Sequence, residues 1–132
     1  MNTNEKKEDA AIDPAEFSVA ETESETNGGS GYEHHFKKPF PYKGKTISTL
    51  YFDWDALTGK DSLAIEQELA TLGKALIAPE FSGEYLTRMA VRACQTTIDG
   101  QRLGVDFFYE MPMRDFNRIR SRARSFLVNS AL

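Results

Sequence analysis

Residues 113–128 read MRDFNRIRSRARSFLV, and no other stretch of the chain has so clear a periodicity. Its apolar residues recur at steps of three and four, the spacing of one face of an α-helix. Pro112 suits the first turn of a helix, where its missing N–H would have had no partner. We therefore predict a helix from about Met113 to Val128 that packs on a core. Its apolar face comprises Met113, Phe116, Ile119, Ala123, Phe126 and Leu127.

An earlier helix is predicted to begin near Gly59. Thr58 and Asp61 have the spacing of a capping box, in which side chains satisfy the backbone N–H groups of a helix start. Pro79 sets the latest point at which this helix can end. Its apolar stripe comprises Ile65, Leu69, Leu72 and Leu76.

A middle helix is predicted after Ser82, a suitable N-cap, and it should stop before Asp99-Gly100. Its narrow apolar face comprises Tyr85, Leu86, Met89, Ala90 and Ala93. A polar link then leads to a short helical turn from Val105 to Glu110.

Two strands precede the helices. Phe36 to Tyr42 and Thr46 to Phe52 are rich in aromatic and β-branched residues, and Lys43-Gly44 between them can form a tight turn. Pro39 and Pro41 favour an edge position for the first strand. The apolar alternation is imperfect, but we predict a β-hairpin.

The N-terminal part has a different composition from the rest. Residues 1–33 contain nine acidic residues and two lysines, a net charge of −7, whereas the remainder carries +3. Low hydrophobicity with high net charge is typical of disordered chains. We predict a disordered acidic tail over residues 1–33, with a Gly/Ser hinge near its end, and one compact domain over 34–132. The predicted class is α+β, with an N-terminal β-hairpin followed by about three main helices.

Few residues suggest catalysis or metal binding. His34 and His35 should point to opposite sides of an extended segment, so we interpret them as solvated residues before the first strand rather than metal ligands. Asp53 and Asp55 are interpreted as solvated acids of a turn. Cys94 lacks an activating histidine and is interpreted as structural. We expect no enzymatic activity and no cofactor.

The sequence also indicates a compartment. A single cysteine allows no internal disulfide, and there is no apolar run of the roughly 20 residues that a membrane helix needs. The N-terminus lacks a signal-peptide pattern. We predict a soluble cytoplasmic protein.

The last predicted helix contains five arginines. Three of them recur every four residues on the side away from its apolar face: Arg114, Arg118 and Arg122. Such a helix can follow a phosphate backbone, so an Arg-rich nucleic-acid-binding module is one hypothesis. The same spacing is expected of a solvated helix face, and the net charge of the domain is small. A further hypothesis is that the acidic tail folds back over these arginines.

Several short motifs follow one another over about 85 residues. They are Tyr42-Lys43-Gly44-Lys45, Leu50-Tyr51-Phe52, Leu57-Thr58-Gly59-Lys60-Asp61, Glu84-Tyr85, Asp106-Phe107-Phe108, Met111-Pro112, Arg114-Asp115 and Phe126-Leu127. In order and spacing they resemble the tail assembly chaperones of long-tailed bacteriophages.

This resemblance implies a protein that binds the tape measure protein in the host cytoplasm and keeps that aggregation-prone helical protein soluble. It further implies help in recruiting tail tube subunits and absence from the mature virion. A small structural subunit of the phage particle is the alternative, and self-association is left open.

A binder of amphipathic helices needs adaptable apolar side chains. We expect the partner-binding surface to draw on Tyr85, Met89, Phe107, Phe108, Tyr109, Met111, Met113, Arg114, Arg118 and Arg122. Ordinary core packing is the alternative role for the apolar members of this set.

Overall fold

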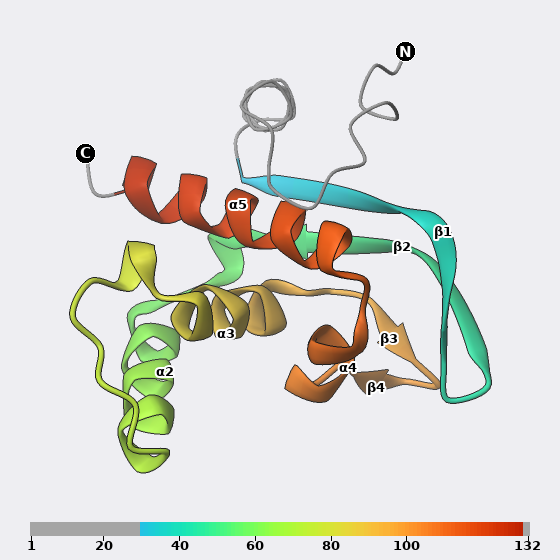
Figure 1. The fold of residues 1–132 in the computed structure, drawn as a ribbon. Coiled ribbons are helices and arrows are strands. Elements are labelled where there is room, and N and C mark those ends of the chain that lie inside the picture. Colours follow the sequence, from blue (N-terminus) through green and yellow to red (C-terminus); the bar gives the residue numbers. More distant parts are fainter. Residues whose placement is uncertain (1–29, 131–132) are drawn as a thin grey trace.

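The computed structural model describes residues 30–130, so most of the predicted acidic tail lies outside the described residues. A β-hairpin is followed by helices, which confirms the predicted α+β class (Figure 1). The three main helices are α2 (Gly59–Thr71), α3 (Gly83–Ala93) and α5 (Met113–Ser130), with a short α4 (Val105–Glu110) between the last two. Helix α5 packs against both the hairpin and α3, and α2 packs on α3.

The hairpin pairs β1 (Gly31–Tyr42) with β2 (Lys45–Asp53) in antiparallel fashion. Its turn is the predicted Lys43-Gly44, where both residues have positive φ angles of 49° and 79°. This backbone conformation matches the twist of the two strands. Strand β1 begins five residues earlier than Phe36, so the expected boundary at residue 33 falls inside it.

The imperfect apolar alternation of the hairpin has a structural cause. Pairing is regular up to His35 and Thr49, and it resumes at Phe40 and Ile47. The intervening segment of β1 is therefore longer than that of β2, and it contains Pro39, which has no N–H to donate. The irregularity changes which residues of β2 face the core.

The helix starts follow the predicted caps. The Thr58 backbone N–H donates to Asp61 Oδ2 over 2.8 Å at the start of α2, and Ser82 Oγ accepts from the Tyr85 N–H over 3.0 Å at the start of α3. Helix α2, however, ends at Thr71 instead of continuing towards Pro79. Gly73 has a φ angle of 74°, and this left-handed residue terminates the helix.

A second small hairpin was not predicted. Strands β3 (Thr97–Ile98) and β4 (Gln101–Arg102) pair across Asp99-Gly100, both with positive φ angles. Asp-Gly is a favoured pair for such a turn. Lys45 Nζ lies 3.3 Å from an Asp99 carboxylate oxygen, which connects this hairpin to the base of β2.

The core is built from aromatic rings contributed by both hairpin strands and by α4. The Phe52 ring stacks on Trp54 with centroids 5.3 Å apart and also contacts Phe108, while Phe40 contacts Phe107 at 5.3 Å. All five side chains are buried. Because β1 and α4 are distant in sequence, this cluster closes the fold.

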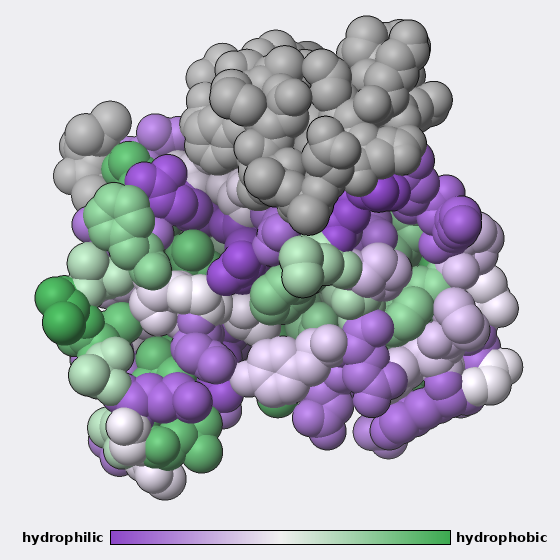
Figure 2. Space-filling model, in the orientation of Figure 1, coloured by the Kyte–Doolittle hydropathy of each residue, from purple (hydrophilic) through white to green (hydrophobic). Residues whose placement is uncertain are grey.

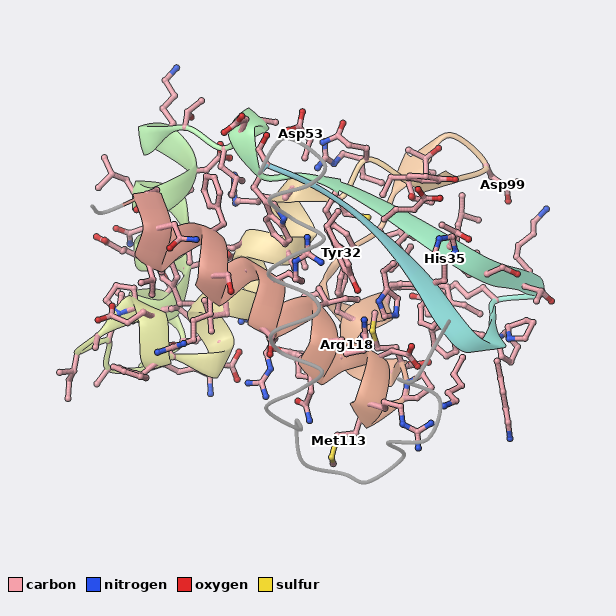
Figure 3. The ribbon with its side chains drawn as sticks, turned by 90° about the horizontal axis from the view of Figure 1, so that it is seen from above. Tyr32, His35, Asp53, Asp99, Met113 and Arg118 are labelled. Carbon is pink, nitrogen blue, oxygen red and sulfur yellow. The ribbon has the colours of Figure 1, made fainter. Side chains whose placement is uncertain are left out.

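His34 is a buried residue of β1, so its interpretation as a solvated residue is wrong. Its Nδ1 lies 2.9 Å from the Tyr32 hydroxyl, and its Nε2 lies 2.8 Å from Asp115 Oδ1 on α5. His35 is exposed on the other side of the strand, as the alternation requires. Figure 3 shows Tyr32 and His35 on β1, which runs beside α5.

Burial lowers the pKa of His34 below the ordinary value of 6.5, against the opposing effect of Asp115. In the unfolded chain His34 binds its proton at higher pH than in the folded protein. The free energy of unfolding should therefore decrease as the pH falls below about 6.5, by up to about 1.4 kcal/mol for each unit between the two pKa values. Chemical unfolding between about pH 5 and 7 measures this slope.

His34→Gln should reduce the slope of this pH dependence, whereas His35→Gln, on the exposed face of the same strand, should leave it intact. An equally steep decrease in both variants would show that other groups cause it.

Candidate protein-binding surface

The residues predicted to bind a partner do not form one surface. Five of the apolar members are buried in the core, so core packing is their role in this fold: Tyr85, Met89, Phe107, Phe108 and Met111. Tyr109 and Met113 are exposed. They belong to α4 and to the start of α5, and the Tyr109 hydroxyl donates to Glu84 Oε1 over 3.0 Å.

The prediction that Arg122 faces solvent is also wrong. Arg122 is fully buried, and its guanidinium lies over the Tyr32 ring, 4.0 Å from the ring centroid. Asp115 is buried on the same side of the helix. Arg114 and Arg118 are half-buried. The buried face of α5 therefore includes two charged residues, Asp115 and Arg122, in addition to the apolar residues from which the face was predicted.

Exposed apolar side chains gather instead on the α2–α3 connection, residues 72–82. Ile77 is 94% exposed and Phe81 is 72% exposed, and Leu72 is also exposed at the end of α2. Figure 2 shows hydrophobic residues at the left of the molecule, over α2 and this connection. Large apolar groups grouped on a surface are typical of interaction sites.

An apolar groove of about 310 Å³ lies between α2, α3 and the last turns of α5. Its polar lining includes the Ser62 and Tyr85 hydroxyls, which are 2.8 Å apart, and Asp61, whose carboxylate accepts a hydrogen bond from Arg92. The apolar lining residues are Leu57, Ile65, Tyr85, Met89, Phe126 and Leu127. Of the residues predicted to bind a partner, Tyr85 and Met89 are the two that line this groove.

The connection and the groove flank the same part of α5. The Arg124 guanidinium lies 5.0 Å from the centroid of the Phe81 ring, while Phe126 and Leu127 line the groove. We call the connection and the groove together the apolar end of the domain. The sequence contained one signal for it, Ile77 and Phe81, which belong to no predicted apolar stripe.

The described residues offer little for catalysis. Within residues 30–130 no three His, Cys, Asp or Glu side chains come together as a metal site. Cys94 is buried, and burial raises the pKa of its thiol, which favours the unreactive protonated form. No helix in the described part of the chain has the length and apolar composition to cross a membrane.

Comparisons with protein families, with curated proteins and with solved structures gave no match for this chain.

The assignment of residues to core and surface predicts that substituting two phenylalanines by alanine lowers the free energy of unfolding by different amounts. Phe107→Ala removes a fully buried ring and should lower the free energy of unfolding by about 3–5 kcal/mol. Phe81→Ala removes an exposed ring and should change it by about 0.5 kcal/mol or less. Denaturant unfolding of both variants checks this, and a large loss for Phe81→Ala would show that the connection belongs to the core.

Proposed function

We propose that the protein is a tail assembly chaperone of a long-tailed bacteriophage, acting without enzymatic chemistry. In this proposal it binds the tape measure protein in the host cytoplasm and keeps that protein soluble. It then helps recruit tail tube subunits and is absent from the finished virion. The exposed apolar end of the domain is the observation that carries the proposal.

A chaperone for long amphipathic helices has to cover apolar stripes without requiring one exact sequence. The half-buried Phe126 and Leu127 side chains of the groove can contact different apolar residues of a partner helix. Ile77 and Phe81 expose further apolar area on the α2–α3 connection. An amphipathic helix laid along it would bury apolar area on both molecules.

Most residues that carry the resemblance to this family have structural roles here. Lys43-Gly44 forms the hairpin turn, Thr58 and Asp61 cap α2, and Phe107 and Phe108 lie in the core. The resemblance therefore supports the proposal at the level of the fold. The apolar end supports it at the level of binding.

Co-expression with the tape measure protein of the same phage tests the proposal. We expect that protein to remain soluble and to co-purify at about 0.5 M salt, because apolar contacts resist screening. Ile77→Ser with Phe81→Ser should reduce the recovered complex about tenfold or more, since hot-spot side chains carry most of the binding energy.

Leu63→Ser is the matched control, because Leu63 is similarly exposed, at 67%, but lies on α2 outside the connection. It should leave the complex unchanged. An insoluble tape measure protein in the presence of wild-type chain would contradict the proposal.

The arginines of α5 favour a second candidate, an Arg-rich nucleic-acid-binding module. Arg114, Arg118, Arg120 and Arg124 all belong to α5 and are half-buried. Binding through phosphate contacts weakens steeply as salt rises, whereas binding at the apolar end does not. Detection of the chain in purified virions would instead favour a structural subunit.

A further inference from the structure

The side of α5 that faces the start of α3 carries two arginines, Arg120 and Arg124. We call these two residues the arginine face. The only acidic residue of α5 is Asp115, which is buried. Arginines four residues apart repel each other, whereas solvated helices usually intersperse both signs of charge.

Two arginines of α3 have carboxylate partners. Arg88 contacts Glu68 and Glu84, and Arg92 Nη1 lies 2.8 Å from Asp61 Oδ1. Within residues 30–130, the hydrogen bonds of Arg120 and Arg124 are instead to neutral groups. Arg120 donates to the Asn117 side chain over 2.8 Å, and Arg124 donates to the Glu80 carbonyl over 3.1 Å.

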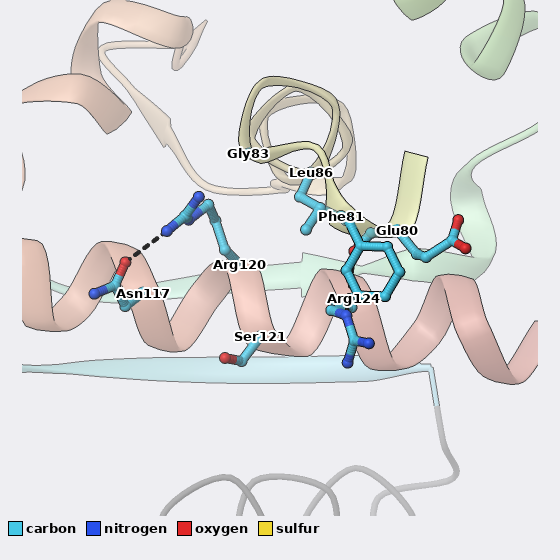
Figure 4. Close-up of a pocket in the computed structure, with 8 residues that line it drawn as sticks. All are labelled: Glu80, Phe81, Gly83, Leu86, Asn117, Arg120, Ser121 and Arg124. Carbon is cyan, nitrogen blue, oxygen red and sulfur yellow. Dashed lines mark hydrogen bonds between the residues drawn. The ribbon is translucent and has the colours of Figure 1, made fainter. Parts of the chain in front are cut away.

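Arg120 and Arg124 line a cleft of about 370 Å³ between α5 and the start of α3 (Figure 4). Phe81 and Leu86 give it an apolar part, Asn117 and Ser121 add polar groups, and Glu80 is its one acidic lining residue. Each guanidinium has five N–H donors, more than these contacts use. The cleft thus combines positive charge, spare donors and apolar surface, which suits an acidic peptide segment.

We propose that the occupant of the arginine face is the acidic N-terminal segment of the same chain, residues 1–29. It carries eight acidic residues and two lysines, a net charge of −6, whereas residues 30–130 carry +2. Charge complementarity of this size favours association. Bound there, the segment keeps nucleic acids and other polyanions off α5.

The segment joins the domain at a suitable place. The Ser30 carbonyl accepts a hydrogen bond from the Trp54 N–H over 2.8 Å, and the Trp54 ring stacks on Phe126 of α5 at 6.3 Å. Arg124 is two residues from Phe126. Twenty-nine residues can span at most about 100 Å when fully extended, and Arg120 and Arg124 are only about 6 Å apart along the helix axis. The covalent link therefore supplies a high effective concentration.

Paramagnetic relaxation enhancement in the full chain tests the contact. A nitroxide on Ser18→Cys should broaden the amides of Asn117, Ser121 and Arg124 at about 0.05 M salt, and the broadening should vanish at about 0.5 M. Cys94 is buried, and Cys94→Ala in the same background removes any labelling there. Arg120→Gln with Arg124→Gln should reduce the low-salt broadening, whereas Lys60→Gln, on exposed α2, should not.

Absence of broadening on α5 at low salt would overturn the proposal, and so would broadening confined to the apolar groove. A mixture of nitroxide-labelled chain and separate isotope-labelled chain tests whether the segment binds a second copy instead. Broadening in that mixture can only be intermolecular. That outcome would also overturn the intramolecular contact.

The proposed shielding has its own readout. A full-length variant with the eight acidic residues of the segment changed to Gln or Asn should bind a fluorescent single-stranded oligonucleotide about tenfold more tightly than wild type at low salt. Equal affinity of the variant and the wild type for the oligonucleotide would overturn the proposed shielding. Neither experiment uses the tape measure protein, so both outcomes are independent of the proposed function.

Discussion

The buried polar contacts between β1 and α5 are the constraint on which the fold depends. Burying a charged group without partners costs several kcal/mol, so Asp115 and Arg122 require specific neighbours on the inner face of α5. Those neighbours are His34, 81 residues before Asp115, and Tyr32, 90 residues before Arg122. The last helix therefore reaches its native surroundings only when the first strand is in place. Contacts of such sequence separation favour cooperative and comparatively slow folding.

The same contacts orient the rest of the domain. With Asp115 and Arg122 turned towards β1, Ile119 and Ala123 face the core, and the last turns present Phe126 to Trp54. Phe126 and Leu127 then complete the groove with α2 and α3. One orientation of α5 thus determines both the apolar end and the arginine face. A rotation of this helix would remove the two surfaces together.

The local features of the fold could be predicted from the sequence because they depend on neighbouring residues. The turn at Lys43-Gly44 and the caps at Thr58 and Ser82 are of this kind. Features set by distant contacts were missed. The end of α2 depends on a left-handed Gly73, and a helical stripe continued beyond it. The start of β1 depends on burial of Tyr32 and His34 by α5, which no local pattern shows.

The candidate site was harder to predict for a related reason. Helical periodicity identifies a side of a helix but does not say whether a polar residue at its border is buried against a partner. Arg122 was assigned to solvent on spacing alone, although a guanidinium over an aromatic ring is a stable buried arrangement. Exposed Ile77 lies in a connection without periodicity. Only the packed structure separates aromatic residues of the core from those left on the surface.

The two surfaces differ in the physics of binding, and this difference separates their roles. Apolar contacts at the groove are little affected by salt, whereas contacts to the arginine face weaken within the ionic strength of a cell. Phe81 lies at the junction of both surfaces, because its ring packs under Arg124 and extends the apolar connection. A partner helix that covers Phe81 would also displace whatever lies against Arg124. Binding at the apolar end and occupancy of the arginine face are therefore expected to be coupled through this one contact.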